Sequence, residues 1–302
     1  MLLKVISTGS QAGNSYALIA DNGEILLLDC GAKYNNILRG IENNNKYPVE
    51  KISGILLTHK HGDHLKSFYD FMRNGINCYG HSELEEYIRK KYGEKIESLE
   101  EKKKIEVGSW HVIPFFLPHT SHVKDEQKII PCPNFGYIIQ NEEMGTMIYA
   151  TDMQAIAVSN GEGCLCDKYG NSYVWDIDRF PFIYEETNGL PCGLPNFLTF
   201  KNMHINHMLI ECNYVFKERA HIDKNKIRHV IRGHHSLENC VGFIKRNKTP
   251  DLRNIILCHL SGENADPETM QREIQSVAGK WVNVEVAHAG DEYVLSKYPW
   301  EV

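Results

Sequence analysis

The sequence predicts an α/β protein in which two β-sheets pack face to face with helices on the outside. The chain has two halves that each begin with strand-like runs and then add helices, and an irregular stretch at about 155–205 separates them. Strands followed by helices in each half are typical of a layered sandwich with one core. Polar side chains that can bind metals also follow several of the apolar runs. We therefore expect one domain over residues 1–302 with an inserted excursion.

The first half is a series of strands followed by helices. The tripeptide Asp21–Gly23 (DNG) between two apolar runs is a strong signal for a tight hairpin. Residues 63–75 carry apolar side chains at helical spacing and stop at an Asn-Gly pair, which predicts one helix. Ser82 and Glu85 form a capping box that predicts a second helix over 82–95. The strands expected here are 2–8, 16–20, 24–31, 51–59, 76–80, 110–119, 135–140 and 146–152.

The second half follows a stretch with weak periodicity. Residues 155–205 are rich in Gly, Pro, Asn and aromatic residues, which is typical of an inserted lid or loop. Cys164 and Cys166 lie in this stretch and are either free thiols or part of an additional zinc site. After it we expect strands at 207–215, 254–261, 281–287 and 291–297, a basic helical piece, and a helix from Pro267 to about Ala278.

Composition describes an ordinary globular chain. No apolar run reaches the eighteen or so residues of a membrane span, and the N-terminus has no secretory leader. The nine cysteines are odd in number and scattered, which favours reduced thiols and a cytoplasmic location. The net charge is −6, but residues 217–253 hold ten Lys/Arg against four Asp/Glu, a local balance of +6. That segment is either a polyanion-binding face or a solvated helix face.

A histidine-rich cluster follows the apolar run that ends at residue 57. His59 and His61 alternate along an extended chain, so both side chains point the same way. A turn at Gly62 would bring Asp63 and His64 back as a second pair at a helix start. Imidazole and carboxylate ligands in this pattern suit two metal ions. Two cations that share one water would lower its pKa and supply the nucleophile at neutral pH.

Two metals need further ligands, and other apolar runs end in residues that supply them. His119 follows 110–118, Asp152 follows 146–151, and His259 follows 254–258. Each of these alone is equally well an ordinary polar loop residue. Strand ends are where sheet-borne sites gather, so together with the cluster they predict a dinuclear centre in which Asp152 bridges. His122 in the same loop is a rival to His119.

The motif THKHGDH at residues 58–64 resembles the HxHxDH signature of the metallo-β-lactamase fold superfamily. The order of the cluster, His119, Asp152 and His259 is similar to that of its dinuclear hydrolases. This resemblance implies a four-layer αββα sandwich of two mixed β-sheets flanked by helices. It also implies two divalent cations, Zn²⁺ or Mn²⁺: the cluster serves both, His119 completes one site, Asp152 bridges, and His259 completes the other.

Within that superfamily the chain is most similar to the YycJ/WalJ-type exonuclease subgroup, over most of residues 1–153 and 207–295. It departs from the subgroup at His235, where leucine is common, and the stretch 155–205 has no counterpart. The motifs that carry the likeness are GSQAGNS at 9–15, ECN at 211–213, GHHSLEN at 233–239 and CHLSGENADPE at 258–268.

Three residues receive roles beyond simple ligation. Asp63 is expected to bind a metal and orient the nucleophile. His234 matches the histidine that faces the leaving oxygen in related phosphodiesterases, so it is our candidate general acid; the alternative is a phosphate-contacting or capping histidine. Asp29 ends an apolar run and resembles the aspartate that holds the histidine loop in place, although a turn-forming aspartate is equally consistent.

Three functions follow from these observations. The first is a metal-dependent phosphodiesterase that hydrolyses nucleic acid, DNA or RNA, as an exonuclease, favoured by Asp152, His234 and the basic segment. The second keeps the metals but takes a small substrate, a cyclic nucleotide or a thioester. The third is a metal-stabilised binding protein without turnover, which the complete ligand set disfavours. Salt-sensitive activity separates the first from the second.

Overall fold

The computed structural model describes the core of the chain and leaves several segments out. The described residues are 1–42, 49–117, 119–123, 128–153, 164–166, 172–174, 200, 203–215, 230 and 233–298. Most of the expected insertion at 155–205 and the first part of the basic segment therefore lie outside the described residues. So do the side chains of Cys164 and Cys166, on which an additional zinc site depends.

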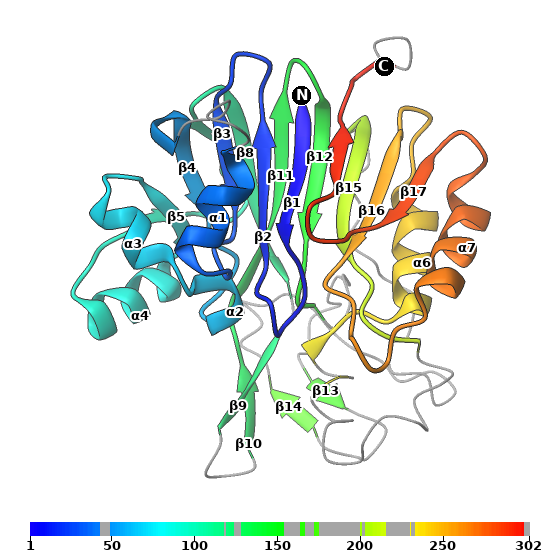
Figure 1. Ribbon diagram of the computed structural model, residues 1–302. Helices are drawn as coiled ribbons and strands as arrows, with labels where there is room; N and C mark the ends of the chain where they lie inside the picture. The colour runs from blue at the N-terminus through cyan, green and yellow to red at the C-terminus, as the bar shows by residue number, and fades with distance from the viewer. Residues whose placement is uncertain are drawn as a thin grey trace.

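Two seven-stranded mixed sheets form the centre of the molecule (Figure 1). In the first sheet the order is β18 (Glu292–Val294), β1 (Leu2–Ser7), β2 (Ser15–Ile19), β3 (Ile25–Leu28), β4 (Ile52–Leu56), β5 (Cys78–His81), β6 (Glu97–Leu99). In the second it is β17 (Asn283–Val286), β16 (Asn254–Cys258), β15 (Ile205–Glu211), β12 (Gly145–Ala150), β11 (Asn134–Asn141), β8 (Trp110–Leu117), β7 (Ile105–Val107).

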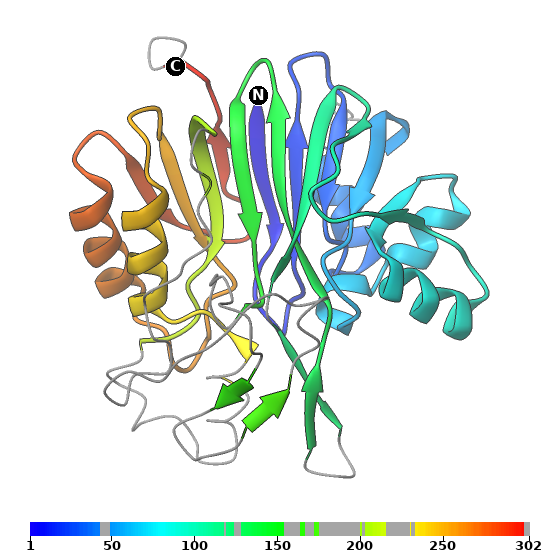
Figure 2. The ribbon, with the colours of Figure 1, turned by 180° about the vertical axis from the view of Figure 1, so that it is seen from behind.

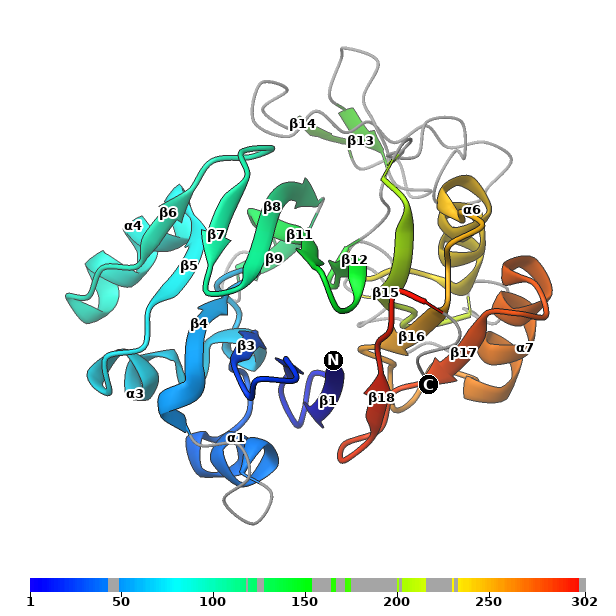
Figure 3. The same ribbon diagram turned by 90° about the horizontal axis from the view of Figure 1, so that it is seen from above.

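Helices cover the outer faces of both sheets. Viewed from above, α1 (Tyr34–Ile41) lies outside the first sheet, and α6 (Leu237–Asn247) and α7 (Pro267–Ala278) lie outside the second (Figure 3). Seen from behind, the two helix groups again flank the strands on opposite sides (Figure 2). The helices are α1 (Tyr34–Ile41), α2 (Gly62–Leu65), α3 (Phe68–Arg73), α4 (Ser82–Tyr92), α6 (Leu237–Asn247) and α7 (Pro267–Ala278), with a short 3-10 turn at Val49–Lys51. No helix among the described residues has the length and apolar character needed to cross a bilayer.

Three buried clusters correspond to the three interfaces between these four layers. One joins the first sheet to its helices, one joins the second sheet to α6 and α7, and the third lies between the sheets, where Tyr16, Tyr137, Tyr149 and Trp110 are fully buried. The predicted αββα sandwich of two mixed sheets flanked by helices is confirmed. The predicted hairpin at Asp21–Gly23 is also confirmed, because β2 and β3 pair antiparallel across it.

Two helix predictions differ from the structure. Residues 63–75 form two helices, because tertiary hydrogen bonds interrupt the helix: His64 O accepts from Cys30 N, and Ser67 N donates to Cys30 O at 2.9 Å. The predicted capping box at Ser82 is wrong by one residue. His81 is the N-cap, and its Nδ1 accepts from Leu84 N at 3.1 Å.

The remaining pairs of strands lie outside the two large sheets. The pair β9 (Thr120–Val123) and β10 (Lys128–Pro131) projects below the sandwich in Figure 1, and β13 (Cys164–Cys166) pairs with β14 (Ser172–Val174). The helix α1 and the short strands β6 and β7 were not anticipated from the sequence.

Candidate metal centre

The candidate site lies at the ends of strands from both sheets. Asp29 follows β3, the histidine cluster follows β4, Asp152 follows β12, and His259 follows β16. Three of these residues, Asp29, Asp152 and His259, have positive φ values of 54°, 52° and 54°. Non-glycine residues rarely adopt this conformation, and such residues gather at functional sites. The backbone is therefore bent at these strand ends, where Asp152 and His259 face one centre and Asp29 contacts the histidine loop.

Glycines allow the first loop to approach the cluster. A Cβ on Gly31 would lie 1.7 Å from Asp63 O, and one on Gly13 would lie 2.1 Å from Gly31 O. The close contact lets Asn14 N donate to Asp63 O at 2.7 Å. Asn14 is fully buried, and its amide nitrogen is 3.1 Å from His64 Nε2. The GSQAGNS loop is thus part of the wall of the site.

His59, His61 and His119 form the three-histidine half of the site. His61 Nδ1 lies 2.9 Å from His59 Nε2 and 3.0 Å from His119 Nε2. Their other nitrogens are used elsewhere: His61 Nε2 bonds Ser121 Oγ at 2.7 Å, and His119 Nδ1 donates to Gly233 O at 2.9 Å. Because the protonated ring nitrogens donate to those partners, the lone pairs of His59 Nε2, His61 Nδ1 and His119 Nε2 face one another. A cation with tetrahedral nitrogen ligands fits such a triad.

Asp63, His64, Asp152 and His259 form the carboxylate half. His64 Nε2 is 2.9 Å from Asp152 Oδ2, and His259 Nε2 is 3.3 Å from the same oxygen. Asp63 Oδ2 is 3.7 Å from both imidazoles. His259 Nε2 is buried and has no hydrogen-bond partner among the described residues. Carboxylate and imidazole ligands at these separations fit a second cation.

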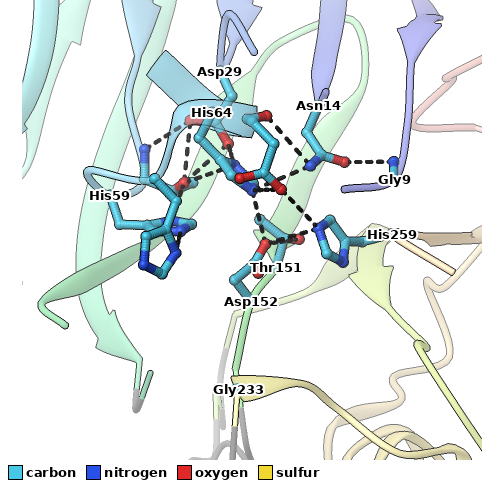
Figure 4. A network of polar contacts seen from close by, with 12 residues as sticks. Gly9, Asn14, Asp29, His59, His64, Thr151, Asp152, Gly233 and His259 are labelled. Atoms are coloured by element: carbon cyan, nitrogen blue, oxygen red, sulfur yellow. Dashed lines mark hydrogen bonds and ion pairs between the residues drawn. The ribbon is translucent and has the colours of Figure 1, made fainter. Parts of the chain in front are cut away.

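Asp152 connects the two halves. Its Oδ2 faces His64 and His259, whereas its Oδ1 lies 3.9 Å from His119 Nε2. The residue is 2% exposed. Figure 4 shows His59 and His259 on opposite sides of Asp152. One oxygen toward each half is the geometry required of a bridging ligand.

The protonation of the two halves differs. Burial lowers the pKa of His61 to about 4 and holds the pKa of His59 well below its usual range. In the carboxylate half burial acts in the same direction on His259, but Asp152, Asp63 and Glu211 outweigh it and raise its pKa to about 10. Burial would raise the pKa of Asp152, yet His259 and His64 hold it well below its usual range.

Asp29 supports the cluster from behind. Its Oδ1 accepts from Thr58 N at 2.8 Å, and its Oδ2 lies 2.7 Å from His64 Nδ1 and accepts from the Tyr149 hydroxyl at 2.7 Å. Asp29 therefore fixes both the loop and the ring of His64 without facing the centre. This arrangement agrees with a supporting aspartate and differs from an isolated turn-forming residue.

Glu211 was not identified as a site residue from the sequence. It is fully buried at the end of β15, and its Oε1 lies 2.8 Å from His234 Nδ1 and 3.1 Å from His259 Nδ1. Its Oε2 accepts from Met153 N and His235 N. Burial acts to raise its pKa, but His234 and His259 lower it below the usual value. The ECN motif at 211–213 was the sequence feature that could have identified Glu211. Ser121, which bonds His61, was also missed, and no sequence feature pointed to it.

The structure brings together every residue predicted for the site: His59, His61, Asp63, His64, His119, Asp152, His234 and His259. His234 lies beside Asp152, with its Nδ1 3.5 Å from Asp152 Oδ1. His122 lies on β9, and its side chain is outside the described residues. His119 occupies the triad, and the structure gives no comparison with the side chain of His122.

Known proteins resemble this chain in part of the sequence and in the fold. A family model described as "Beta-lactamase superfamily domain" matches residues 25–170. No curated protein matches the chain. Among solved structures, Zn²⁺-bound PqqB from Methylobacterium extorquens is 11% identical, with a TM-score of 0.64, over 98% of this chain and 100% of that one.

Two further structures have the same fold. Unliganded yeast PDE1 is 14% identical with a TM-score of 0.63, and the match covers 96% of this chain and 98% of that one. A diphosphatase from the PhnP family is 17% identical with a TM-score of 0.55, over 97% of this chain and 96% of that one. Together these likenesses show that the chain has the metallo-β-lactamase fold.

Proposed function

We propose that the protein is a dinuclear-metal phosphodiesterase that hydrolyses nucleic acid, most simply as an exonuclease of the YycJ/WalJ type. The observation that carries this proposal is His234, an imidazole that Glu211 holds beside the centre, with its Nδ1 3.5 Å from Asp152 Oδ1. Its Nδ1 lies 2.8 Å from Glu211 Oε1, which fixes the orientation of the ring, and we assign Nε2 as the atom that donates the proton. Hydrolysis of a phosphodiester needs a proton for the departing alcohol, and a histidine is suited to supply it near neutral pH.

The described side chains divide the chemical tasks. Two divalent cations, held by the three-histidine half and the carboxylate half with Asp152 between them, would lower the pKa of water and polarise a phosphoryl oxygen. Burial would raise the pKa of Asp63, but His64 and His259 lower it to about 2, so its carboxylate is charged and able to orient the attacking water. Glu211 fixes the ring of His234 and, through its second contact, that of His259.

Nucleic acid as the substrate rests on the sequence. Residues 217–253 carry a local balance of +6 on a chain of net charge −6, and phosphate backbones bind to such segments. Among the similar structures, one is named as a diphosphatase, and phosphoryl chemistry on this fold supports the proposal.

The test uses purified protein with Mn²⁺ or Zn²⁺ and end-labelled single- and double-stranded DNA and RNA, beside a cyclic nucleotide and a thioester. We expect stepwise shortening of the polymer that weakens steeply with salt. Asp63→Ala and His64→Ala should abolish cleavage while fold and DNA binding persist, and His204→Ala, on a side chain 85% exposed, should have no effect. Cleavage retained in both site variants would remove the mechanism.

A small phosphodiester or a thioester is the second candidate. A cavity of about 620 Å³ adjoins His234 and has the size of a pocket for a single small molecule. Turnover of the cyclic nucleotide or the thioester, without competition from a long polymer, would establish this alternative.

A further inference from the structure

The cavity beside His234 lies on the side of the carboxylate half. Its walls come from residues 8–12, which follow β1, from residues 260–264, which follow His259, and from Asn213 and Val230. Figure 4 shows Gly9 and His259 on the same side of Asp152, opposite His59. At about 620 Å³ the cavity accommodates one nucleoside-sized group in reach of the His234 ring.

The walls offer hydrogen bonds rather than positive charge. Among the described residues that line the cavity there is no lysine or arginine, and Glu263 contributes a carboxylate. Asn213 is 3% exposed; its side-chain Nδ2 donates to His259 O at 2.7 Å, while no hydrogen bond from a described residue reaches its side-chain Oδ1. Asn264 is oriented by a 3.0 Å bond from its Nδ2 to Ser261 Oγ.

This lining is suited to bind an uncharged polar group of a ligand. Carboxamides and hydroxyls recognise the hydroxyl and amide edges of a nucleoside, and a site built for hydrogen bonding discriminates strongly against groups that leave it unpaired. A phosphate in the cavity would instead meet the Glu263 carboxylate, and like charges repel.

We infer that this cavity binds the leaving group of the substrate, and this inference rests on the phosphodiester hydrolysis proposed above. The leaving group would be a nucleoside that ends in a free hydroxyl rather than a phosphate. Water adds to phosphorus, and the bond from phosphorus to the nucleoside oxygen breaks. That oxygen takes a proton from His234, which regains from solvent the proton that the water released. The products are a phosphomonoester and an alcohol.

The experiment compares three substrates with the metal-loaded, full-length protein: adenylyl-adenosine, the same dinucleotide with an added phosphate on its first nucleoside, and one with it on its second. One of the two added phosphates should raise KM by about tenfold or more, and the other should change KM by less than about threefold. Glu263→Lys should reduce the larger penalty by about threefold or more. The matched control, Glu285→Lys, changes a carboxylate that does not line this cavity and should leave the penalty as it is.

The outcomes separate this inference from the function on which it rests. Failure to hydrolyse bis(p-nitrophenyl) phosphate or any dinucleotide contradicts the proposed function itself. Equal KM values for all three dinucleotides, or tighter binding of both phosphorylated forms, overturn only the inference. A penalty that Glu263→Lys and Glu285→Lys leave equally large also overturns the assignment to this cavity.

Discussion

The two halves of the metal centre can each hold a cation, but they differ in the charge of their ligands. In the three-histidine half, burial lowers the pKa values of His59 and His61, that of His61 to about 4, so these two imidazoles are neutral at pH 7. The carboxylate half offers negative oxygens, and these raise the pKa values of His64 and His259. The first half is therefore ready for a cation, whereas the second must exchange protons for one.

The supports of the two halves differ in the same way. His61 Nε2 is held by a neutral hydroxyl, Ser121 Oγ at 2.7 Å. His259 Nδ1 is held by the buried carboxylate of Glu211 at 3.1 Å, which also holds His234. Hydrogen bonds to charged groups are about twice as strong as neutral ones. Charge is thus concentrated in the half that also carries the candidate acid.

Removal of the bridging charge should have the largest effect. Asp152→Asn keeps the shape of the side chain but weakens both halves, so we expect activity to fall by about a thousandfold or more. Elemental analysis should show bound metal falling from two ions per chain to one or fewer. Asp251→Asn at the surface is the control. Two retained ions would contradict the bridging role.

As the pH falls, the carboxylate half should lose its cation before the three-histidine half does. His259, with a pKa of about 10, is protonated at pH 7 before a cation binds, and the raised pKa of His64 has the same consequence. Affinity at the carboxylate half should therefore rise by about tenfold per pH unit for each proton displaced. The three-histidine half should be insensitive down to about pH 5, because a lowered pKa keeps His61 neutral.

Titration calorimetry with Zn²⁺ in buffers of different ionisation enthalpy measures this difference. Proton release should accompany one binding step and not the other. Equal release in both steps would remove the distinction between the halves.

Loss of the Glu211 charge should have an intermediate effect. In Glu211→Gln the amide has only one acceptor oxygen, so it cannot accept from the two imidazoles and also from Met153 N and His235 N, and the common support of His234 and His259 is lost. Metal affinity or turnover should fall by about 10- to 100-fold. Glu238→Gln, in the first turn of α6, is the matched control. An unchanged pH profile and metal content would show that Glu211 is only a packing residue.

Ser121→Ala should have the smallest effect of the four. It removes a neutral acceptor from His61 Nε2 and leaves the ligand itself in place. We expect a loss of activity of about tenfold or less, because a neutral hydrogen bond contributes about 1 kcal/mol. Kinetics at saturating metal provide the measurement. A loss greater than that of Glu211→Gln would reverse the comparison of the two supports.

Residues close together in the chain were the easiest to predict. His59, His61, Asp63 and His64 lie within six positions, so strand alternation and one turn largely fix how they face. His119, Asp152 and His259 could be placed because each follows an apolar run. Contacts between distant segments were harder: the helix expected over 63–75 is interrupted by bonds to Cys30, which no local pattern reveals.

By itself, the sequence determined the layered fold, the histidine cluster and the strand-end positions of the other ligands, because periodicity and spacing act over a few residues. Only the tertiary structure decided that Glu211 holds both His234 and His259, that Ser121 supports His61, and that the first loop walls a cavity beside them. The reason is physical: the role of a buried carboxylate or hydroxyl depends on which donors lie within about 3 Å of it, and these donors come from segments that are distant in the chain.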